Sequence, residues 1–130
     1  MHARVLIADD SPVVRQHVSQ LVRQRPEWEV CGEAVDGADA VQKVRDLSPD
    51  LVILDFLMPG LNGLEAAREI SRQVPDVPIL LCTMYLSPQL VDLARGAGVK
   101  GALSKTNLSE LTSGLETILR GETFFFSVDR

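Results

Sequence analysis

Five short apolar segments, each separated from the next by a stretch of helical character, constrain the fold of this chain most. They span residues 4–8, 28–35, 51–55, 78–83 and 100–104. Apolar runs of this length are typical of strands, and their alternation with helices predicts βα units around a parallel sheet. The first, third and fourth runs are apolar without alternation, as expected for inner strands covered on both faces. The second contains Glu29 and Glu33, so we expect it at an edge of the sheet.

Local signals mark where the helices begin. A serine followed by proline offers a capping hydroxyl and a residue suited to the first helical position, as in Ser11-Pro12 and Ser87-Pro88. Two pairs have the spacing of a capping box, namely Asn62 with Glu65 and Asn107 with Glu110. These signals predict helices directly after the first, third, fourth and fifth strands.

The length of the chain is that of one ordinary domain. With 130 residues, 45% of them hydrophobic, it can bury one well-formed core but not two. We expect a single domain over residues 1–122, followed by a C-terminal tail or the start of a linker over residues 123–130. The three phenylalanines at 124–126 leave two interpretations open: a last helical turn against the core, or an exposed patch for a dimer or a linker.

Charge and cysteine usage exclude several classes of function. The chain has 13 Lys and Arg against 18 Asp and Glu, a net charge of −5, which argues against direct nucleic-acid binding by this segment. Cys31 and Cys82 lie in apolar strand-like runs without a second ligand at metal-binding spacing, so we expect buried thiols in a reducing cytoplasm. The apolar runs are too short to span a membrane, and we expect no membrane contact.

Polar side chains follow four of the five predicted strands. Asp9 and Asp10 follow the first strand, Asp55 the third, Thr83 the fourth and Lys105 the fifth. Parallel strands joined by helices point the same way, and open α/β sheets bind their ligands at the carboxyl ends of the strands. If these strands are neighbours, three carboxylates, one hydroxyl and one ammonium converge at one edge.

Three converging carboxylates need a cation to stay ionised. Two carboxylates about 4 Å apart repel by roughly 4 kcal/mol at an effective dielectric constant near 20. No His or Cys follows a predicted strand, which argues against zinc, whereas Mg²⁺ prefers carboxylate and phosphate oxygens. A dication beside a carboxylate nucleophile, with a lysine and a threonine nearby, is suited to phosphoryl transfer onto Asp55.

The motifs IADDSP (residues 7–12) and LDFLMPGLNG (residues 54–63), with Thr83 and Lys105, resemble the receiver domain of bacterial two-component response regulators. The resemblance extends from residue 3 to about residue 122. The stretches GAGVKGALSK and NLSELTSGLETILRGE are also similar to receivers of the helix-turn-helix transcription regulators of the NarL/FixJ type. The resemblance implies a doubly wound (βα)5 fold of the flavodoxin-like or CheY-like kind, with five parallel strands in the order 2-1-3-4-5.

The resemblance also implies a role for each polar residue at the strand ends. Asp55 would be the phosphorylated residue, Asp10 and Asp55 direct ligands of Mg²⁺, and Asp9 a ligand through bound water. The backbone carbonyl of Leu57 would be a further metal ligand. Lys105 would pair with the phosphate.

The switch and the partners follow from the same resemblance. Thr83 would turn its hydroxyl to the phosphate and pull the following loop with it. The phosphoryl donor would be a histidine kinase or a histidine phosphotransferase. The face of the fourth helix, fifth strand and fifth helix would then change shape, form a homodimer or control transcription through another domain. Such a domain is not a turnover enzyme.

Two positions depart from the family pattern and leave a second function open. Ala102 stands where an aromatic ring usually takes part in the switch, and Met84 stands where a small residue usually follows the threonine. We consider that Tyr85 supplies the missing ring, or that the chain is a phosphorylation-independent interaction module. A phosphatase of the haloacid dehalogenase type is disfavoured, because Leu57 occupies the place of its second aspartate.

Overall fold

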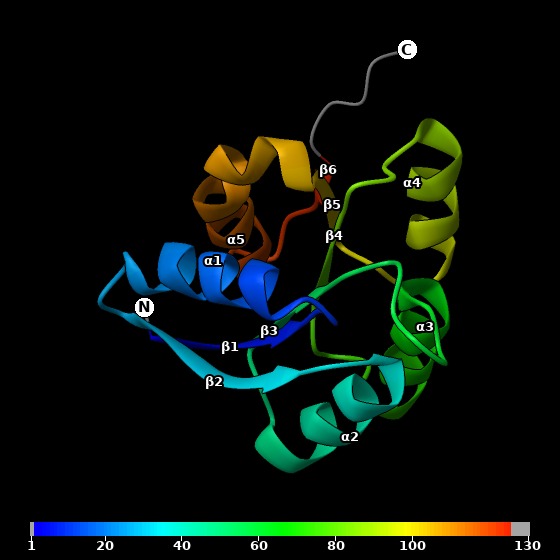
Figure 1. Ribbon diagram of the computed structural model, residues 1–130, viewed down its shortest axis with the longest axis horizontal. Coiled ribbons are helices and arrows are strands. Elements are labelled where there is room, and N and C mark those ends of the chain that lie inside the picture. The colour runs from blue at the N-terminus through cyan, green and yellow to red at the C-terminus, as the bar shows by residue number, and fades with distance from the viewer. Residues whose placement is uncertain (1, 126–130) are drawn as a thin grey trace.

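The computed structural model describes residues 2–125, a parallel sheet between two layers of helices (Figure 1). The strands of these residues are β1 (Ala3–Ala8), β2 (Trp28–Ala34), β3 (Leu51–Leu54), β4 (Ile79–Thr83), β5 (Gly101–Ser104) and β6 (Phe124–Phe125). The α-helices are α1 (Pro12–Arg23), α2 (Gly37–Leu47), α3 (Gly63–Gln73), α4 (Pro88–Gly96) and α5 (Leu111–Leu119). A 3₁₀ helix, η1 (Lys105–Glu110), leads from β5 into α5.

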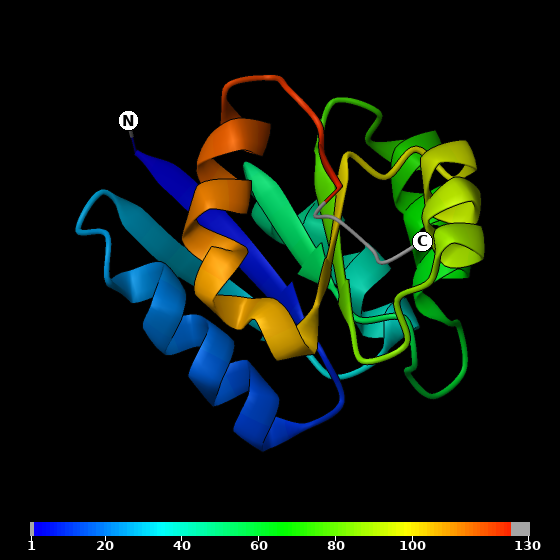
Figure 2. The same cartoon turned by 90° about the horizontal axis from the view of Figure 1, so that it is seen from above.

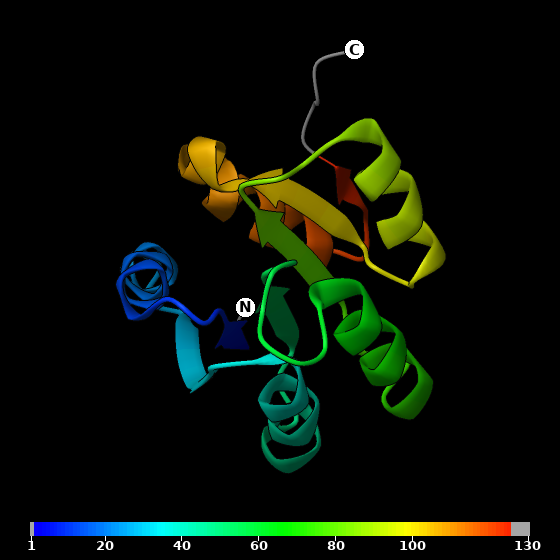
Figure 3. The same cartoon turned by 45° about the vertical axis from the view of Figure 1, so that its right-hand side comes forward.

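The strands lie in the order β2-β1-β3-β4-β5-β6, and every neighbouring pair is parallel. The order predicted for the first five strands is therefore observed, with β2 at an edge. Helices α1 and α5 cover one face of the sheet, and α2, α3 and α4 cover the other (Figures 2 and 3). Because successive strand residues point to opposite faces, Leu6 packs in the core beneath α2 to α4, whereas Val5 and Ile7 pack beneath α1 and α5.

Three of the four predicted helix starts have the expected caps. The hydroxyls of Ser11 and Ser87 each accept a hydrogen bond from the backbone N–H three residues on, and Asn62 with Glu65 forms the complete capping box. The box predicted at Asn107 is wrong. Ser104 instead caps η1 by accepting a bond from the Thr106 N–H, and α5 begins only at Leu111, without a side-chain cap.

The prediction of a five-stranded sheet is also wrong, because Phe124 and Phe125 add a sixth strand. The Phe124 N–H donates to the carbonyl oxygen of Lys100 at 2.9 Å, and Phe124 and Phe125 pair with Gly101 and Ala102 of β5. Neither interpretation of the phenylalanines foresaw a strand. Phe126 lies outside the described residues.

The two rings of β6 pack on opposite faces of the sheet. Phe124 joins the core beneath α5, where a Cβ at Gly114 would lie 2.8 Å from its ring. Phe125 joins the core on the α4 side, and the Arg95 guanidinium lies 3.9 Å from the centre of its ring. Lacking a side chain at Gly114, helix α5 has room for Phe124, and the segment continues the sheet instead of the helix.

Candidate functional site

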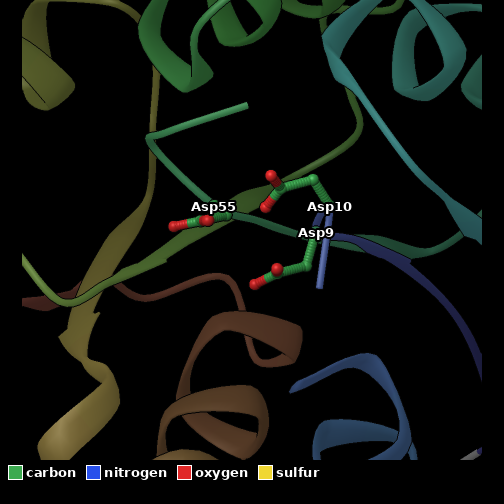
Figure 4. A group of neighbouring side chains, drawn as sticks. All are labelled: Asp9, Asp10 and Asp55. Carbon is green, nitrogen blue, oxygen red and sulfur yellow. The ribbon is translucent and has the colours of Figure 1, made fainter. Parts of the chain in front are cut away.

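Three aspartates lie together where β1 and β3 end (Figure 4). Asp9 and Asp10 follow β1, and Asp55 follows β3, which is the neighbour of β1 in the sheet. One carboxylate oxygen from each of the three lies within 4.8 Å of the others. Asp9 and Asp55 are buried, whereas Asp10 is exposed. The structure therefore brings together the three carboxylates that the sequence placed at one edge.

Lys105 lies between the two buried carboxylates. Its Nζ is 2.7 Å from Oδ2 of Asp9 and 3.1 Å from Oδ2 of Asp55. The lysine reaches both because β5 ends at Ser104 and the chain turns directly into η1. Its side chain is only 11% exposed, so this double ion pair is shielded from solvent far more than an ordinary surface pair.

Each buried carboxylate also accepts a hydrogen bond from the backbone. Oδ1 of Asp9 accepts from the Ser11 N–H at 2.9 Å, and Oδ1 of Asp55 accepts from the Phe56 N–H at 2.8 Å. These bonds fix the direction in which each side chain leaves its strand. The remaining oxygen of each, Oδ2, faces Lys105.

The surroundings of Asp55 disfavour its charged form. Burial raises the pKa of Asp55, and the charge of Asp9 raises it further, while the ammonium of Lys105 and the Phe56 N–H partly offset both. Burial also lowers the pKa of Lys105, but the hydrogen bond to Asp9 and the charges of both aspartates outweigh it, so that this pKa is raised overall. Lys105 thus stays protonated beside the carboxylates.

The remaining predicted residues lie around this cluster. Thr83 ends β4 and is fully buried; its register partner is Ser104, the neighbour of Lys105. The Thr83 hydroxyl accepts a hydrogen bond from the Tyr85 N–H at 3.2 Å. Leu57 lies in the loop after Asp55, with about half of its surface exposed.

The cluster fits a hard divalent cation. The three carboxylates carry three negative charges and Lys105 one positive charge, which leaves a net charge of −2. All the candidate ligand atoms are oxygens, the donor type that Mg²⁺ prefers. Charge and donor chemistry therefore both favour Mg²⁺ at Asp9, Asp10 and Asp55.

The family model for the response regulator receiver domain matches residues 5–116. The chain belongs to this family. Receiver domains act as signalling domains rather than as turnover enzymes, and they bind Mg²⁺ at an acidic cluster such as the one formed here.

Known relatives support the same assignment of this receiver domain. The response regulator protein VraR of Staphylococcus epidermidis is 32% identical over 126 residues, which are 96% of this chain and 60% of that protein. This chain therefore spans less than two thirds of the length of VraR. A two-component response regulator of the LuxR family from an Aurantimonas species superposes with a TM-score of 0.93 at 33% identity, covering 96% of this chain and 90% of that one.

A third relative is the signal receiver domain of the response regulator NarL from Mycobacterium tuberculosis. It superposes with a TM-score of 0.86 at 28% identity, covering 93% of this chain and 98% of that one. These relatives confirm the resemblance to receivers of the NarL type. Across residues 2–125, this receiver domain has no helix that is both long enough and apolar enough to cross a bilayer.

One residue at this edge was missed from the sequence. Arg15, on α1, donates from Nη1 to the backbone carbonyl oxygen of Asp9 at 2.7 Å and from Nε to Oε1 of Glu33 at 2.9 Å. No spacing rule predicts a bond from a side chain to the backbone of another loop. The only available signals were a basic residue shortly after Asp9-Asp10 and an acidic one near the end of the second apolar run.

Proposed function

We propose that Asp55 accepts a phosphoryl group from a histidine kinase or a histidine phosphotransferase in a cytoplasmic phosphorelay. The observation that carries this proposal is the position of Asp55, buried at a strand end and within 4.8 Å of Asp9 and Asp10. A carboxylate oxygen of Asp55 forms a bond to phosphorus as the bond from phosphorus to the donor imidazole breaks. The imidazole leaves with the electron pair of that bond and takes up a proton.

The acidic cluster would hold the metal that this transfer needs. In the proposed arrangement, Asp10 and Asp55 bind Mg²⁺ directly, Asp9 binds through water, and the backbone carbonyl of Leu57 is a further ligand. When bound, Mg²⁺ would offset the negative charge of the cluster and of the phosphoryl oxygens. The net charge of −2 on the three carboxylates and Lys105 supports this arrangement.

Lys105 is proposed to hold the phosphoryl group in place. Its ammonium already lies 3.1 Å from Asp55, and the phosphorylated residue, an acyl phosphate, would carry phosphoryl oxygens in place of the carboxylate charge. The lysine would then exchange one anionic partner for another without leaving its position beside Asp9. It would therefore stabilise charge on the transferred group at little cost in reorganisation.

Thr83 is proposed to link the phosphate to the rest of the domain. A hydroxyl turned toward Asp55 would give up the hydrogen bond from the Tyr85 N–H, which contributes about 1 kcal/mol. This bond belongs to the loop that leads into α4, so its loss would free that loop to move. The face formed by α4, β5 and α5 would then change and act on a second copy or on transcription, through another part of a longer protein.

Phosphorylation can be tested by intact mass spectrometry. The chain is incubated with acetyl phosphate and Mg²⁺, and we expect the mass of one phosphoryl group to be gained. Asp55→Asn removes the acceptor and should abolish the gain, while Asp92→Asn, an exposed aspartate on α4, should leave it unchanged. A chelator should also abolish it. A gain that persists in Asp55→Asn would refute the proposed acceptor.

A second function is favoured by Ala102 and Met84. Ala102 is fully buried and contributes no ring to a switch, and Met84, which follows Thr83 in the chain, is 55% exposed. These residues would suit an interaction module that has kept the fold and lost its response to phosphate. Absence of any mass gain in the wild-type chain, under conditions that modify another receiver domain, would favour this function.

A further inference from the structure

Arg15 links the backbone that follows β1 to a side chain on β2. Its guanidinium donates to the carbonyl oxygen of Asp9, after β1, and to the carboxylate of Glu33, on β2. The Arg15 side chain is 15% exposed, although it arises from the first turns of α1 at the domain surface. One planar group thus ties together the ends of two neighbouring strands.

This pair differs from an ordinary surface ion pair. Arg72 and Glu69, for comparison, pair along one helix at i,i+3, and the Arg72 side chain is 70% exposed. Such pairs contribute little, because solvent screens them and two long side chains must be ordered. Arg15 is far less exposed, its partner Glu33 lies 18 residues away, and one of its donors is directed to a backbone carbonyl.

The bond to the Asp9 carbonyl fixes more than Asp9 itself. The carbonyl group of Asp9 and the N–H of Asp10 belong to the same peptide unit, which is planar. Holding the oxygen therefore sets the orientation of that plane, and with it the direction in which the Asp10 side chain leaves the backbone. Asp10 is exposed, so packing does little to fix its carboxylate in position.

We infer that Arg15 is a positioning residue of the magnesium site, oriented by Glu33 and acting through the peptide between Asp9 and Asp10. The inference rests on the proposed function of Asp9, Asp10 and Asp55 as the magnesium site. Arg15 touches none of the reacting atoms. It acts on the metal as the outer hydrogen-bond partners of metal ligands do, by restricting the ligand to its binding orientation.

The direction in which Mg²⁺ affinity changes when Arg15 is removed distinguishes a positioning role from a purely electrostatic one. As a cation held at the end of β1 beside Asp9, Arg15 would repel Mg²⁺, and its removal would tighten metal binding. As a positioning residue, Arg15 restricts Asp10 before the metal binds, so Asp10 loses less conformational entropy on binding. Removal of Arg15 would then weaken metal binding. The two roles therefore predict opposite changes in the dissociation constant of Mg²⁺.

The test measures Mg²⁺ binding by isothermal titration calorimetry, without any phosphodonor. Arg15→Met keeps the apolar stem and removes both donors and the charge; we expect the Kd for Mg²⁺ to rise about tenfold. Arg15→Lys keeps the charge but not the planar fork, and its Kd should lie between those of the wild type and Arg15→Met. Glu33→Gln should raise the Kd by a smaller factor.

Arg72→Met is the matched control, because it removes an arginine from an exposed ion pair on α3. Its Kd should equal that of the wild type. Urea unfolding of each variant verifies that it is folded at the titration temperature; if Arg15→Met is not, Glu33→Gln and Arg15→Lys still decide the sign. An unchanged or lower Kd in the folded Arg15 and Glu33 variants would overturn the positioning role. Failure of the wild type to bind Mg²⁺ would instead refute the proposed metal site.

Discussion

Two edges of the sheet are built on opposite principles. At the carboxyl ends of β1 and β3, Asp9 and Asp55 are buried close to each other and held by Lys105. At the outer side of β5, two phenylalanine rings of β6 fill apolar space on both faces of the sheet. The first edge contains a carboxylate, Asp55, whose charged form is disfavoured by burial and by the charge of Asp9, whereas the second contains rings that add apolar burial. We attribute the first to the proposed phosphoacceptor function and the second to packing.

This contrast gives opposite expectations for mutations at the two edges. Neutralising Asp55 removes the repulsion from Asp9 and the cost of burying a charge, which raise its pKa, so it should raise the free energy of unfolding. Disturbing the contacts of β6 should lower it, because apolar area is lost or atoms are forced together. Substitutions at the two edges should therefore change the free energy of unfolding in opposite directions.

The largest effect is expected for Gly101→Ala on β5. A Cβ there would lie 2.5 Å from the carbonyl oxygen of Phe124 and 2.7 Å from Cδ1 of Ile118. Because the first of these atoms belongs to the backbone, β6 must move away from β5, and we expect the free energy of unfolding to fall by about 2 kcal/mol. Urea unfolding monitored by circular dichroism measures it.

Gly96→Ala is the control for this substitution. A Cβ at Gly96, the last residue of α4, meets nothing within 4 Å, so the unfolding free energy should stay the same or rise slightly. Equal stability of Gly101→Ala and the wild type would show that β6 contributes nothing to the fold. Packing of β6 would then not stabilise the fold, and the proposed contrast between the two edges would be refuted.

The same two edges show what the sequence can and cannot predict. Strands β1 to β5 were predicted because each lies in a largely apolar run of strand length that alternates with helical stretches. Among the described residues strand β6 has only two, and although Thr and Phe favour extended backbone, so short a run does not by itself predict a strand. It is a strand because Gly101 and Gly114 leave room for Phe124, a condition set by residues that are distant in the chain.

The candidate site shows a similar division. The meeting of Asp9, Asp55 and Lys105 could be predicted, because parallel strands must end at a common edge. The bond from Arg15 to the Asp9 backbone could not, because it depends on how α1 packs beside β2. The proposed roles of these residues in phosphoryl transfer stay predictions until phosphorylation and metal binding are measured.

An intermediate effect, of opposite sign, is expected for Asp55→Asn. Burial and the charge of Asp9 raise the pKa of Asp55 in the folded state above its ordinary value of 3.8. A carboxyl with a raised folded pKa favours folding only while it is protonated, and this contribution is lost as the pH rises through the folded pKa. Asparagine carries no charge, so at neutral pH we expect the unfolding free energy to rise, by an amount on the order of the 1 kcal/mol that is usual for single substitutions.

The stability difference between Asp55→Asn and the wild type should depend on pH. The advantage of Asp55→Asn should be full above the folded pKa of Asp55, shrink as the pH falls, and vanish below about 3.8, where the wild type is protonated in both states. Asp92→Asn, on the exposed surface of α4, should change stability by less than about 0.5 kcal/mol. A loss of stability in Asp55→Asn would mean that the ion pair with Lys105 outweighs the cost of burial. Asp55 would then stabilise the fold, and the proposed contrast between the two edges would be refuted.

The smallest effect is expected for Arg95→Met on α4. The guanidinium of Arg95 lies 3.9 Å from the ring centre of Phe125, and methionine retains an apolar stem but no charge over that ring. A cation–π contact at an exposed position contributes about 0.5–1 kcal/mol, so the unfolding free energy should fall by that amount. Arg68→Met, an exposed arginine on α3, serves as the control and should change nothing measurable.

A double-mutant cycle with Phe125→Ala separates the contact from other effects of the substitution. If Arg95 acts through the ring, Arg95→Met should cost nothing further once Phe125 is alanine. An equal cost in both backgrounds would assign the effect to α4 itself. Charge at the β6 edge would then contribute nothing through the ring, and the ring of Phe125 would be held by apolar packing, which would make the two edges differ more sharply still.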